Sequence, residues 1–178
     1  SWTSVSAGSS YTFALRTDGT LWAWGLNTTS QLGDSTVVSK SSPVQIGTSS
    51  WNSVGTANAG TGWYSNGIRS DGRLFTWGYN NYGGLGTGDT LARSSPTQIG
   101  TSSWSQIAAG GSFSVAIRAD GGLFAWGLNS SGQLGDGTTV NKSSPVQVGT
   151  SSWTSVSAGG THTAAIRTDS GVFTWGAG

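Results

Sequence analysis

Cysteine, methionine and glutamate are absent from the 178 residues, and histidine occurs once. A chain without cysteine has no disulfide framework and no thiolate zinc site, so its cysteine content does not indicate a compartment. Eight Lys and Arg side chains oppose seven Asp side chains, and the formal net charge of +1 gives no basic patch for nucleic acid. No apolar run reaches the length of a membrane span. The composition therefore predicts no nucleic-acid partner and no membrane insertion.

Tryptophan is frequent, and its spacing divides the chain into repeats. Thirty glycines in a Ser- and Thr-rich chain would favour disorder, but ten Trp residues argue for a packed structure. Trp-Gly pairs begin at residues 24, 77, 126 and 175, which are 53, 49 and 49 residues apart, and another Trp opens each unit at residues 2, 51, 104 and 153. This period predicts repeat units over residues 1–50, 51–103, 104–152 and 153–178, the last one incomplete.

The clearest copy of the repeated pattern is Asp-Gly-Gly-Leu-Phe-Ala-Trp-Gly at residues 120–127. Asp-Gly is typical of a tight hairpin turn, and the Leu-aromatic-small-Trp run that follows is typical of a strand. In the first unit, strands are predicted over residues 2–7, 11–16, 21–24 and 43–46, the last opened by a proline. Four short strands per unit predict an all-β fold, a β-propeller of four-stranded blades with about three and a half blades present.

The second unit departs from the common pattern. Its four additional residues lie between Trp51 and Trp77, and residues 55–64 predict a longer glycine-rich loop. Aromatic residues of this unit also break the recurrence, and they are Trp63, Tyr64, Tyr79 and Tyr82. Since aromatics in loops that do not recur in every unit are better candidates for recognition than for blade packing, we predict that these four contact a partner.

Side chains that recur in every unit have two interpretations. An Arg stands two residues before each hairpin Asp, and these arginines either bind anions around a channel or hydrogen-bond within their own hairpins; repetition favours the second. The recurring tryptophans either form an exposed sugar-stacking face or fill the wedges between blades, and their fixed phase favours burial. His162 occupies a position held by Tyr11, Tyr64 and Phe113 in the other units, which favours a packing role.

No catalytic, cofactor or metal site can be assembled from these residues. One His, no Cys and no Glu leave neither a Ser-His-Asp set nor a metal site of the usual spacing. Asp34, Asp89 and Asp136 lie in glycine-rich loops that offer one carboxylate each, which is too few for a calcium site and is typical of turns. We therefore expect a protein that is not an enzyme.

Two stretches carry a resemblance to a known family. They are Ala-Gly-Gly-x-His-Thr-x-Ala-Ile at residues 158–166 and Asp-Gly-x-Leu-Phe-x-Trp-Gly-x-Asn-x-x-Gly-Gln-Leu-Gly at residues 120–135. The pattern resembles the regulator of chromosome condensation repeat, in near-identical copies of a bacterial or phage-like type. The resemblance covers the whole chain and implies part of a seven-bladed β-propeller. Propellers of this family serve as nucleotide-exchange factors, enzyme inhibitors and binding scaffolds, so the resemblance alone does not select a function.

Three functions follow as hypotheses. The first is a non-enzymatic scaffold that presents loops to a protein or a surface glycan, as part of a larger secreted, cell-surface or virion protein that is extracellular or surface-exposed. The second is a carbohydrate-binding lectin with one shallow pocket per repeat and multivalent binding. The third, ranked last, is guanine-nucleotide exchange on a small GTPase, because the largest departure from the repeat is only four residues long.

An arc of three and a half blades does not close a propeller, and an open arc exposes strand edges. Closure then requires either the rest of a longer chain or a second copy. Two copies would end in the same half-blade, so we expect a longer parent chain.

Overall fold

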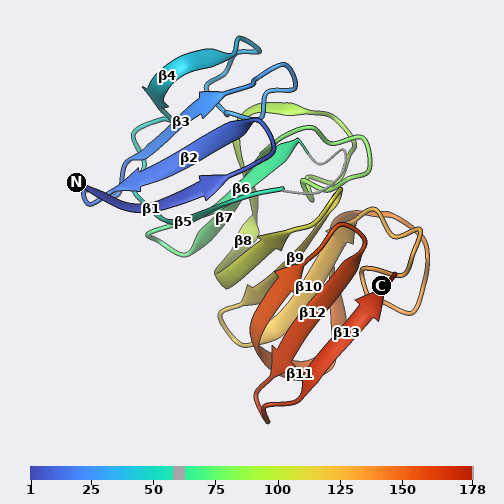
Figure 1. Cartoon of the computed structure of the whole chain (residues 1–178). Helices are drawn as coiled ribbons and strands as arrows, with labels where there is room; N and C mark the ends of the chain where they lie inside the picture. Colours follow the sequence, from blue (N-terminus) through green and yellow to red (C-terminus); the bar gives the residue numbers. More distant parts are fainter. Residues whose placement is uncertain (58–62, 178) are drawn as a thin grey trace.

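A computed structural model describes residues 1–57 and 63–177, and its strands form four successive blades (Figure 1). The first blade contains β1 (Trp2–Ala7), β2 (Tyr11–Arg16), β3 (Leu21–Gly25) and β4 (Lys40–Gln45). The strands that follow are β5 (Trp51–Thr56), β6 (Tyr64–Arg69), β7 (Arg73–Gly78), β8 (Arg93–Ala109), β9 (Phe113–Arg118), β10 (Gly122–Gly127), β11 (Lys142–Ala158), β12 (His162–Arg167) and β13 (Val172–Gly176). All neighbouring strands pair antiparallel, as the alternating hairpins of the sequence predict.

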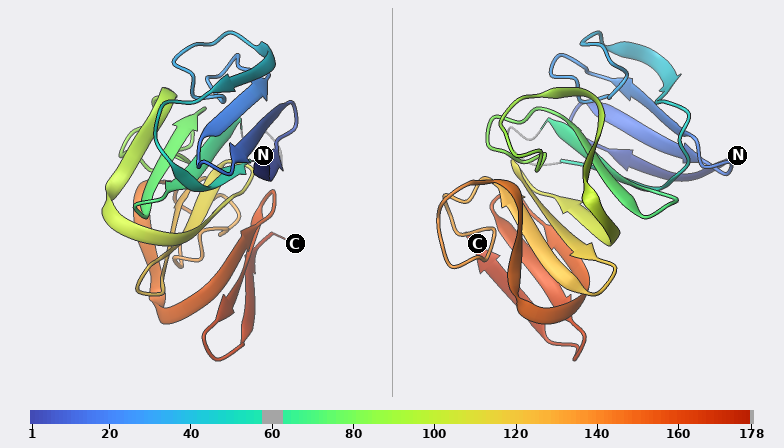
Figure 2. Two further views of the ribbon diagram at one scale, coloured as in Figure 1. Left: turned by 90° about the vertical axis from the view of Figure 1, so that its left-hand side faces the viewer. Right: turned by 180° about the vertical axis from the view of Figure 1, so that it is seen from behind.

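The blades follow one another along an arc, with the first and the fourth at its opposite ends (Figures 1 and 2). The opening strands of neighbouring blades lie close together: the side-chain amide of Gln106 donates to the carbonyl oxygen of Val156 at 3.2 Å and accepts from its N–H at 3.0 Å. The hydroxyls of Ser6 and Thr56 are 3.2 Å apart at the first interface. The all-β propeller architecture predicted from the repeats is confirmed.

The fourth strand of each unit differs from the prediction. We expected a strand that starts at Pro43, but β4 begins at Lys40 and Pro43 lies inside it. The ladder with β3 shifts register between Ala23 and Gly25, so the proline falls where regular pairing is interrupted and its missing N–H costs little. In the later units this strand continues into the next opening strand, so β8 and β11 are each 17 residues long and join adjacent blades.

The hydrophobic core lies between the blades. Phe13, Leu21 and Leu32 of the first blade pack against Trp51 and Trp77 of the second. At the next interface, Leu74 and Ile99 of the second blade pack against Trp104 and Trp126 of the third, whose rings lie edge to face at 6.1 Å. At the third interface, Leu134 and Val148 pack against Trp153 and Trp175 of the fourth blade, whose rings are 6.0 Å apart. The expectation that the recurring tryptophans fill wedges between blades is confirmed for Trp51, Trp77, Trp104 and Trp126, which are all buried.

From the second blade onward, one tryptophan of each blade packs against the Leu-Gly step of the blade before it. The indole Nε1–H of Trp126 donates to the carbonyl oxygen of Gly84 at 2.9 Å. Gly86 has a φ of +75°, and a Cβ atom there would lie 2.7 Å from Nε1 of Trp126. The same close approach recurs where Gly33 meets Trp77 and where Gly135 meets Trp175. Glycine is required at this step both for its backbone conformation and for the approach of the ring.

A buried asparagine organises each long loop. In the loop between β10 and β11, the side-chain nitrogen of Asn129 donates to Oδ1 of Asp136 at 3.1 Å, and to the carbonyl oxygens of Thr138 at 3.0 Å and Val140 at 3.2 Å. Its side-chain oxygen accepts from the main-chain N–H of Leu134 at 3.0 Å. One amide thus satisfies polar groups spread over eleven residues of loop.

Asn27 and Asn80 play the same part in the loops of the first two blades. The loop carboxylates accept hydrogen bonds from these amides and also form ion pairs with Lys or Arg side chains. The pairs are Lys40–Asp34 at 3.1 Å, Arg93–Asp89 at 2.6 Å and Lys142–Asp136 at 3.5 Å. The three carboxylates therefore belong to turn structure, as the sequence predicts.

Alanine substitutions at two glycines distinguish the stability lost through backbone strain from the stability lost at the contact between blades. Gly86 and Gly132 both have φ above +70°, but only Gly86 faces an indole ring; a Cβ atom at Gly132 would meet nothing within 4 Å. We expect Gly132→Ala to lower the free energy of unfolding by about 1 kcal/mol through strain. Gly86→Ala should lower it by roughly 2 kcal/mol more, because the ring of Trp126 must move. Urea unfolding measures both, and equal losses would contradict the contact.

Removal of a loop asparagine tests the polar organisation. Asn129→Ala leaves the buried N–H of Leu134 and two carbonyl oxygens without their partner, so the free energy of unfolding should fall by about 2–3 kcal/mol. Asn81→Ala, in an exposed position of the neighbouring loop, is the control and should stay within about 0.5 kcal/mol of the parent chain. If Asn129→Ala left the free energy of unfolding unchanged, the amide would not be needed, and water would satisfy the same groups.

Candidate functional site

The long loops gather at one rim of the arc, and we call residues 26–39, 79–92 and 128–141 the long-loop rim. Main-chain bonds attach the start of each loop to the neighbouring hairpin turn: Leu26 N–H to Ser10 O at 2.8 Å, Tyr79 N–H to Trp63 O at 3.0 Å and Leu128 N–H to Ser112 O at 3.0 Å. The views in Figure 2 show these loops at the same end of the strands. A partner that approaches this rim meets several blades at once.

Two of the predicted partner-binding residues are exposed, Tyr82 on this rim and Trp63 in the neighbouring hairpin turn. Trp63 is 37% exposed and Tyr82 is 38% exposed. Tyr79 is half-buried, and its main chain is bonded to that of Trp63, so the fold brings these two residues of the prediction together. The loop predicted over residues 55–64 is described only in part, because residues 58–62 lie outside the described residues.

Tyr64 is a correction to the prediction, because it is only 1% exposed. Its hydroxyl donates to the carbonyl oxygen of Phe113 in the next blade, and the hydroxyl of Tyr11 donates to the carbonyl oxygen of Tyr64 at 2.8 Å. Burial raises the pKa of both tyrosines, that of Tyr11 to about 12. Tyr64 therefore joins blades and cannot contact a partner.

His162, at the corresponding position of the fourth blade, is exposed at the end of the arc, but its ring lies over Gly159 as the ring of Phe113 lies over Gly110, in the packing role expected for it.

A row of apolar loop tips was not among the residues predicted to contact a partner. Val38, Leu91 and Val140 hold equivalent positions in the three long loops and are 61%, 65% and 62% exposed. Their carbonyl oxygens accept from Asn27, Asn80 and Asn129, so their main chains are fixed while their side chains project outward. The signal in the sequence was an apolar residue that recurs at the same position of an otherwise polar loop, where no core packing is predicted.

The recurring arginines have a local role, as the sequence predicts. Arg118 donates to both carboxylate oxygens of Asp120, and its guanidinium carbon lies 4.8 Å from the centre of the Phe124 ring. These hydrogen bonds hold the pKa of Asp120 at about 2. Arg69 and Arg167 repeat the arrangement with Asp71 and Asp169. Arg16 instead lies over the rings of Trp2 and Trp22.

Residues 1–57 and 63–177 contain no group of three His, Asp, Cys or Glu side chains placed to bind a metal ion. The same residues contain no helix long and apolar enough to cross a membrane.

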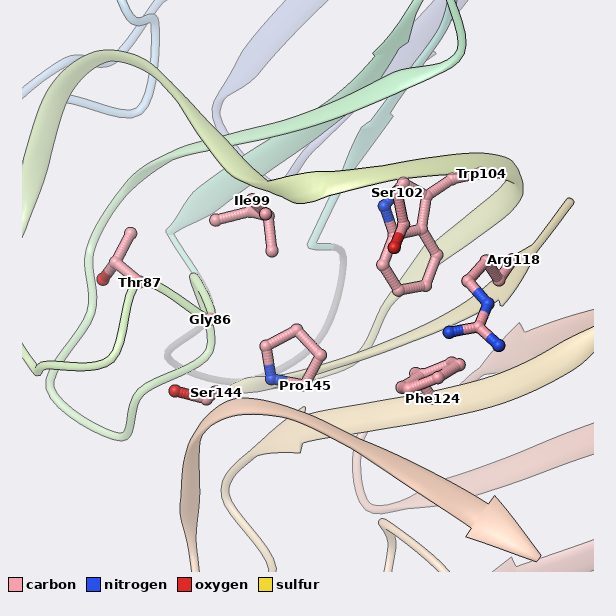
Figure 3. Close-up of a pocket in the computed structure, with 10 residues that line it drawn as sticks. Gly86, Thr87, Ile99, Ser102, Trp104, Arg118, Phe124, Ser144 and Pro145 are labelled. Carbon is pink, nitrogen blue, oxygen red and sulfur yellow. The ribbon is translucent and has the colours of Figure 1, made fainter. Parts of the chain in front are cut away.

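A cleft of about 320 Å³ lies between the second and third blades (Figure 3). Ile99, Trp104, Phe124 and Pro145 line it, and the side chain of Arg118 lies over Phe124 at one end. Within the described residues, the buried Nε1 of Trp104 has no hydrogen-bond partner.

A corresponding cleft of about 270 Å³ lies at the next interface, lined by residues that include Val148, Ser151, Trp153 and Phe173. The clefts are therefore a feature of the repeat.

Comparison with known sequences finds the same repeat. A family model described as "Regulator of chromosome condensation (RCC1) repeat" matches residues 18–62, 71–117 and 120–166, and a second model of this repeat matches residues 2–31 and 104–133. The chain is 32% identical over 112 residues to the RCC1 domain-containing protein RUG3, mitochondrial, of Arabidopsis thaliana. It is 32% identical over 96 residues to the Ultraviolet-B receptor UVR8 of the same plant. The alignments cover 61% and 53% of the chain but only 25% and 21% of the relatives.

Solved structures show the same fold. Human WBSCR16 superposes with a TM-score of 0.87 at 24% identity, over 99% of the chain and 47% of that structure. Yeast RCC1 (Prp20), in a structure with Kap60, superposes with a TM-score of 0.84 at 20% identity, over 98% of the chain and 43% of that structure. The chain thus spans less than half the length of these propellers. Its blades and the three matched stretches show that the chain belongs to the Regulator of chromosome condensation (RCC1) repeat family.

Proposed function

We propose that this chain is the recognition segment of a non-enzymatic β-propeller and binds another protein through the long-loop rim. The observation that carries the proposal is the row of exposed apolar side chains on that rim. Val38, Leu91 and Val140 project from three equivalent loops, and Trp63 and Tyr82 add aromatic surface to the second blade. Exposed apolar and aromatic side chains on well-supported loops are typical of protein interfaces.

The paired charges of the rim favour a partner that is not itself highly charged. Each loop carboxylate is paired with the Lys or Arg that begins the strand after its loop, so the rim presents apolar tips beside neutralised charges. Such a surface suits a partner that buries side chains rather than one that carries many phosphates.

One structural relative, yeast RCC1 (Prp20), supports a protein partner. One of its solved structures has it bound to Kap60, and another is described together with its binding to Gsp1p and histones. For the present chain, we propose a surface-exposed or extracellular propeller, on the basis of its Ser-, Thr- and Gly-rich loops and near-identical repeats.

A second candidate function is carbohydrate binding in the clefts between blades. The recurrence of the cleft at two interfaces favours it, because a lectin with one shallow pocket per repeat requires equivalent sites. The aromatic rings of Trp104 and Phe124 that line the cleft suit a sugar, whose C–H face stacks on such rings. The lining is largely apolar, so this candidate ranks below protein recognition.

The rim can be tested with a photo-crosslinking amino acid in place of Tyr82, and in place of Thr168 on the opposite hairpin rim as a control. We expect a protein to be captured from position 82 only. With that protein purified, alanine at Trp63, Tyr82 and Leu91 together should weaken its affinity by at least about tenfold in calorimetry, because exposed aromatic and apolar anchors dominate interfaces. A matched triple variant, Thr17→Ala, Ser70→Ala and Thr168→Ala, should leave affinity unchanged. Equal affinities for both triples would disprove rim recognition.

The clefts can be tested on a glycan array followed by titration. Ser144 is exposed at the mouth of the cleft between the second and third blades, and Ser42 holds the same repeat position on the first blade, where no blade faces it. If sugars occupy the clefts, Ser144→Trp should reduce retention and Ser42→Trp should not. Absence of any retained sugar at millimolar concentration, or equal effects of the two variants, would remove this candidate.

A further inference from the structure

Arg73 is the cationic side chain to which the fold gives no partner. Six of the eight Lys and Arg side chains form ion pairs with carboxylates, and Arg16 lies over the rings of Trp2 and Trp22. Residues 1–57 and 63–177 include every charged side chain, and among them Arg73 forms no ion pair and no side-chain hydrogen bond. Arg73 therefore carries a positive charge that nothing in this part of the chain neutralises.

One guanidinium nitrogen of Arg73 is also buried. Nη1 is shielded from solvent and has no hydrogen-bond partner, whereas the residue as a whole is half-buried. A buried charged donor without an acceptor costs free energy, and proteins pair nearly all such groups with protein, water or an ion. The side chain is thus held in place and needs an acceptor from outside the chain.

A second arginine faces Arg73 across the hairpin. Ile68 pairs with Leu74 in the ladder of β6 and β7, so Arg69 and Arg73 form the next pair towards the turn. Like charges directly opposite each other in a β-ladder are destabilising. The other blades have a neutral residue at the position of Arg73, which is Thr20, Gly122 or Gly171. The pair of arginines is therefore particular to the second blade.

The equivalent position of the third blade shows where the Arg73 side chain begins. A Cβ atom at Gly122 would lie 3.8 Å from Nη2 of Arg118, the arginine across its hairpin. By the same geometry, Arg73 begins beside Arg69, whose guanidinium carbon lies 4.9 Å from the centre of the Phe75 ring. The two arginines of the second blade therefore lie on one face of their hairpin.

Arg69 keeps a donor that its equivalents use. Arg118 and Arg167 each bind their hairpin carboxylate through both Nε and Nη2. Arg69 donates to Asp71 through Nη2 alone, at 2.7 Å, and the other carboxylate oxygen of Asp71 accepts from the main-chain N–H of Arg73 at 3.1 Å. Asp71 thus neutralises one of the two guanidiniums and leaves Nε of Arg69 free to donate.

Ser103 adds a hydroxyl to the same row. It is the register partner of Arg73 on β8, and it is exposed. Residues directly opposite each other on antiparallel strands share a face of the sheet. Arg69, Arg73 and Ser103 are consequently neighbours across β6, β7 and β8, and we call them the arginine row.

We propose that the arginine row is a binding site for a single phosphate or sulfate group. Such a group carries nearly two negative charges, so it relieves the repulsion between the guanidiniums and accepts their free N–H groups in the geometry typical of arginine. With one carboxylate beside two arginines, the site has charge for one such group and not for a polyanion. The row lies at the hairpin turns, so the proposal does not depend on recognition by the long-loop rim.

The first test is an NMR titration of the whole chain with inorganic phosphate, followed at the arginine Nε–H signals. We expect the signals of Arg69 and Arg73 to shift with a dissociation constant of about 1 mM. The signals of Arg118 and Arg167, which hold the same hairpin position as Arg69 without a second arginine, should not move. Chloride at the same ionic strength is the control, and equal shifts with chloride, or equal shifts of all four arginines, would overturn the proposal.

Two variants exchange the residue that distinguishes the second blade. Arg73→Thr installs the residue of the first blade and should weaken phosphate binding at least about tenfold. Gly122→Arg places a second arginine opposite Arg118 and should make the Arg118 signal respond to phosphate. Without phosphate, both variants should melt within roughly 2 °C of the parent chain, which shows that the fold is kept. Unchanged phosphate binding by Arg73→Thr would overturn the proposal, as would an unresponsive Arg118 in a folded Gly122→Arg chain.

A comparison of anions identifies the source of the group. Tighter binding of O-phosphoserine than of inorganic phosphate would support a phosphorylated side chain as the ligand, and the opposite order would support a free anion. Acetate carries one negative charge and can be held by a single guanidinium, so it should bind much more weakly than either. Acetate binding as tight as that of phosphate would overturn the proposal.

Discussion

The contact between a tryptophan and the Leu-Gly step of the preceding blade is the interaction on which this structure depends. Blades of a propeller have few contacts beyond their neighbours, so the stability of the arc is the sum of its interfaces. At each interface the indole ring fills the wedge, its N–H binds a loop carbonyl, and glycine allows the ring to approach. A change at Trp126 or Gly86 therefore acts on two blades at once.

The same contact connects the core to the loops. The carbonyl held by the tryptophan lies at the start of the Leu-Gly step, and a buried Asn fixes the remainder of the same loop. The loops are consequently ordered from both ends although they contain much glycine. An ordered loop can present Val38, Leu91 and Val140 to a partner at a lower entropic cost than a mobile one.

Most carboxylates of the described residues are bound within their own repeat unit. Asp71, Asp120 and Asp169 are ion-paired within their hairpins, Asp18 accepts hydrogen bonds from Thr20, and Asp136 and its equivalents are bound by their loops. A charge that is satisfied locally in every unit stabilises that unit. In the proposed function, recognition uses side chains that the repeat leaves exposed, which are the apolar loop tips Val38, Leu91 and Val140 and the aromatic residues Trp63 and Tyr82 of the second blade.

The amino-acid sequence by itself determined the repeat length, the first three strands of each unit, the hairpin turns and the burial of Trp51, Trp77, Trp104 and Trp126, whereas Trp2 is 55% exposed. These follow from local chemistry, because Asp-Gly turns and alternating apolar residues act within a few neighbours and recur in register. The tertiary structure alone decided what each exposed position faces. Tyr64 is a loop aromatic by pattern, yet its hydroxyl reaches Phe113 in the next blade; Val140 is an apolar residue by composition, yet no blade covers it. Burial depends on contacts with the neighbouring blade, whose residues lie about fifty positions away in the sequence. The pattern of nearby residues therefore does not predict which positions are buried.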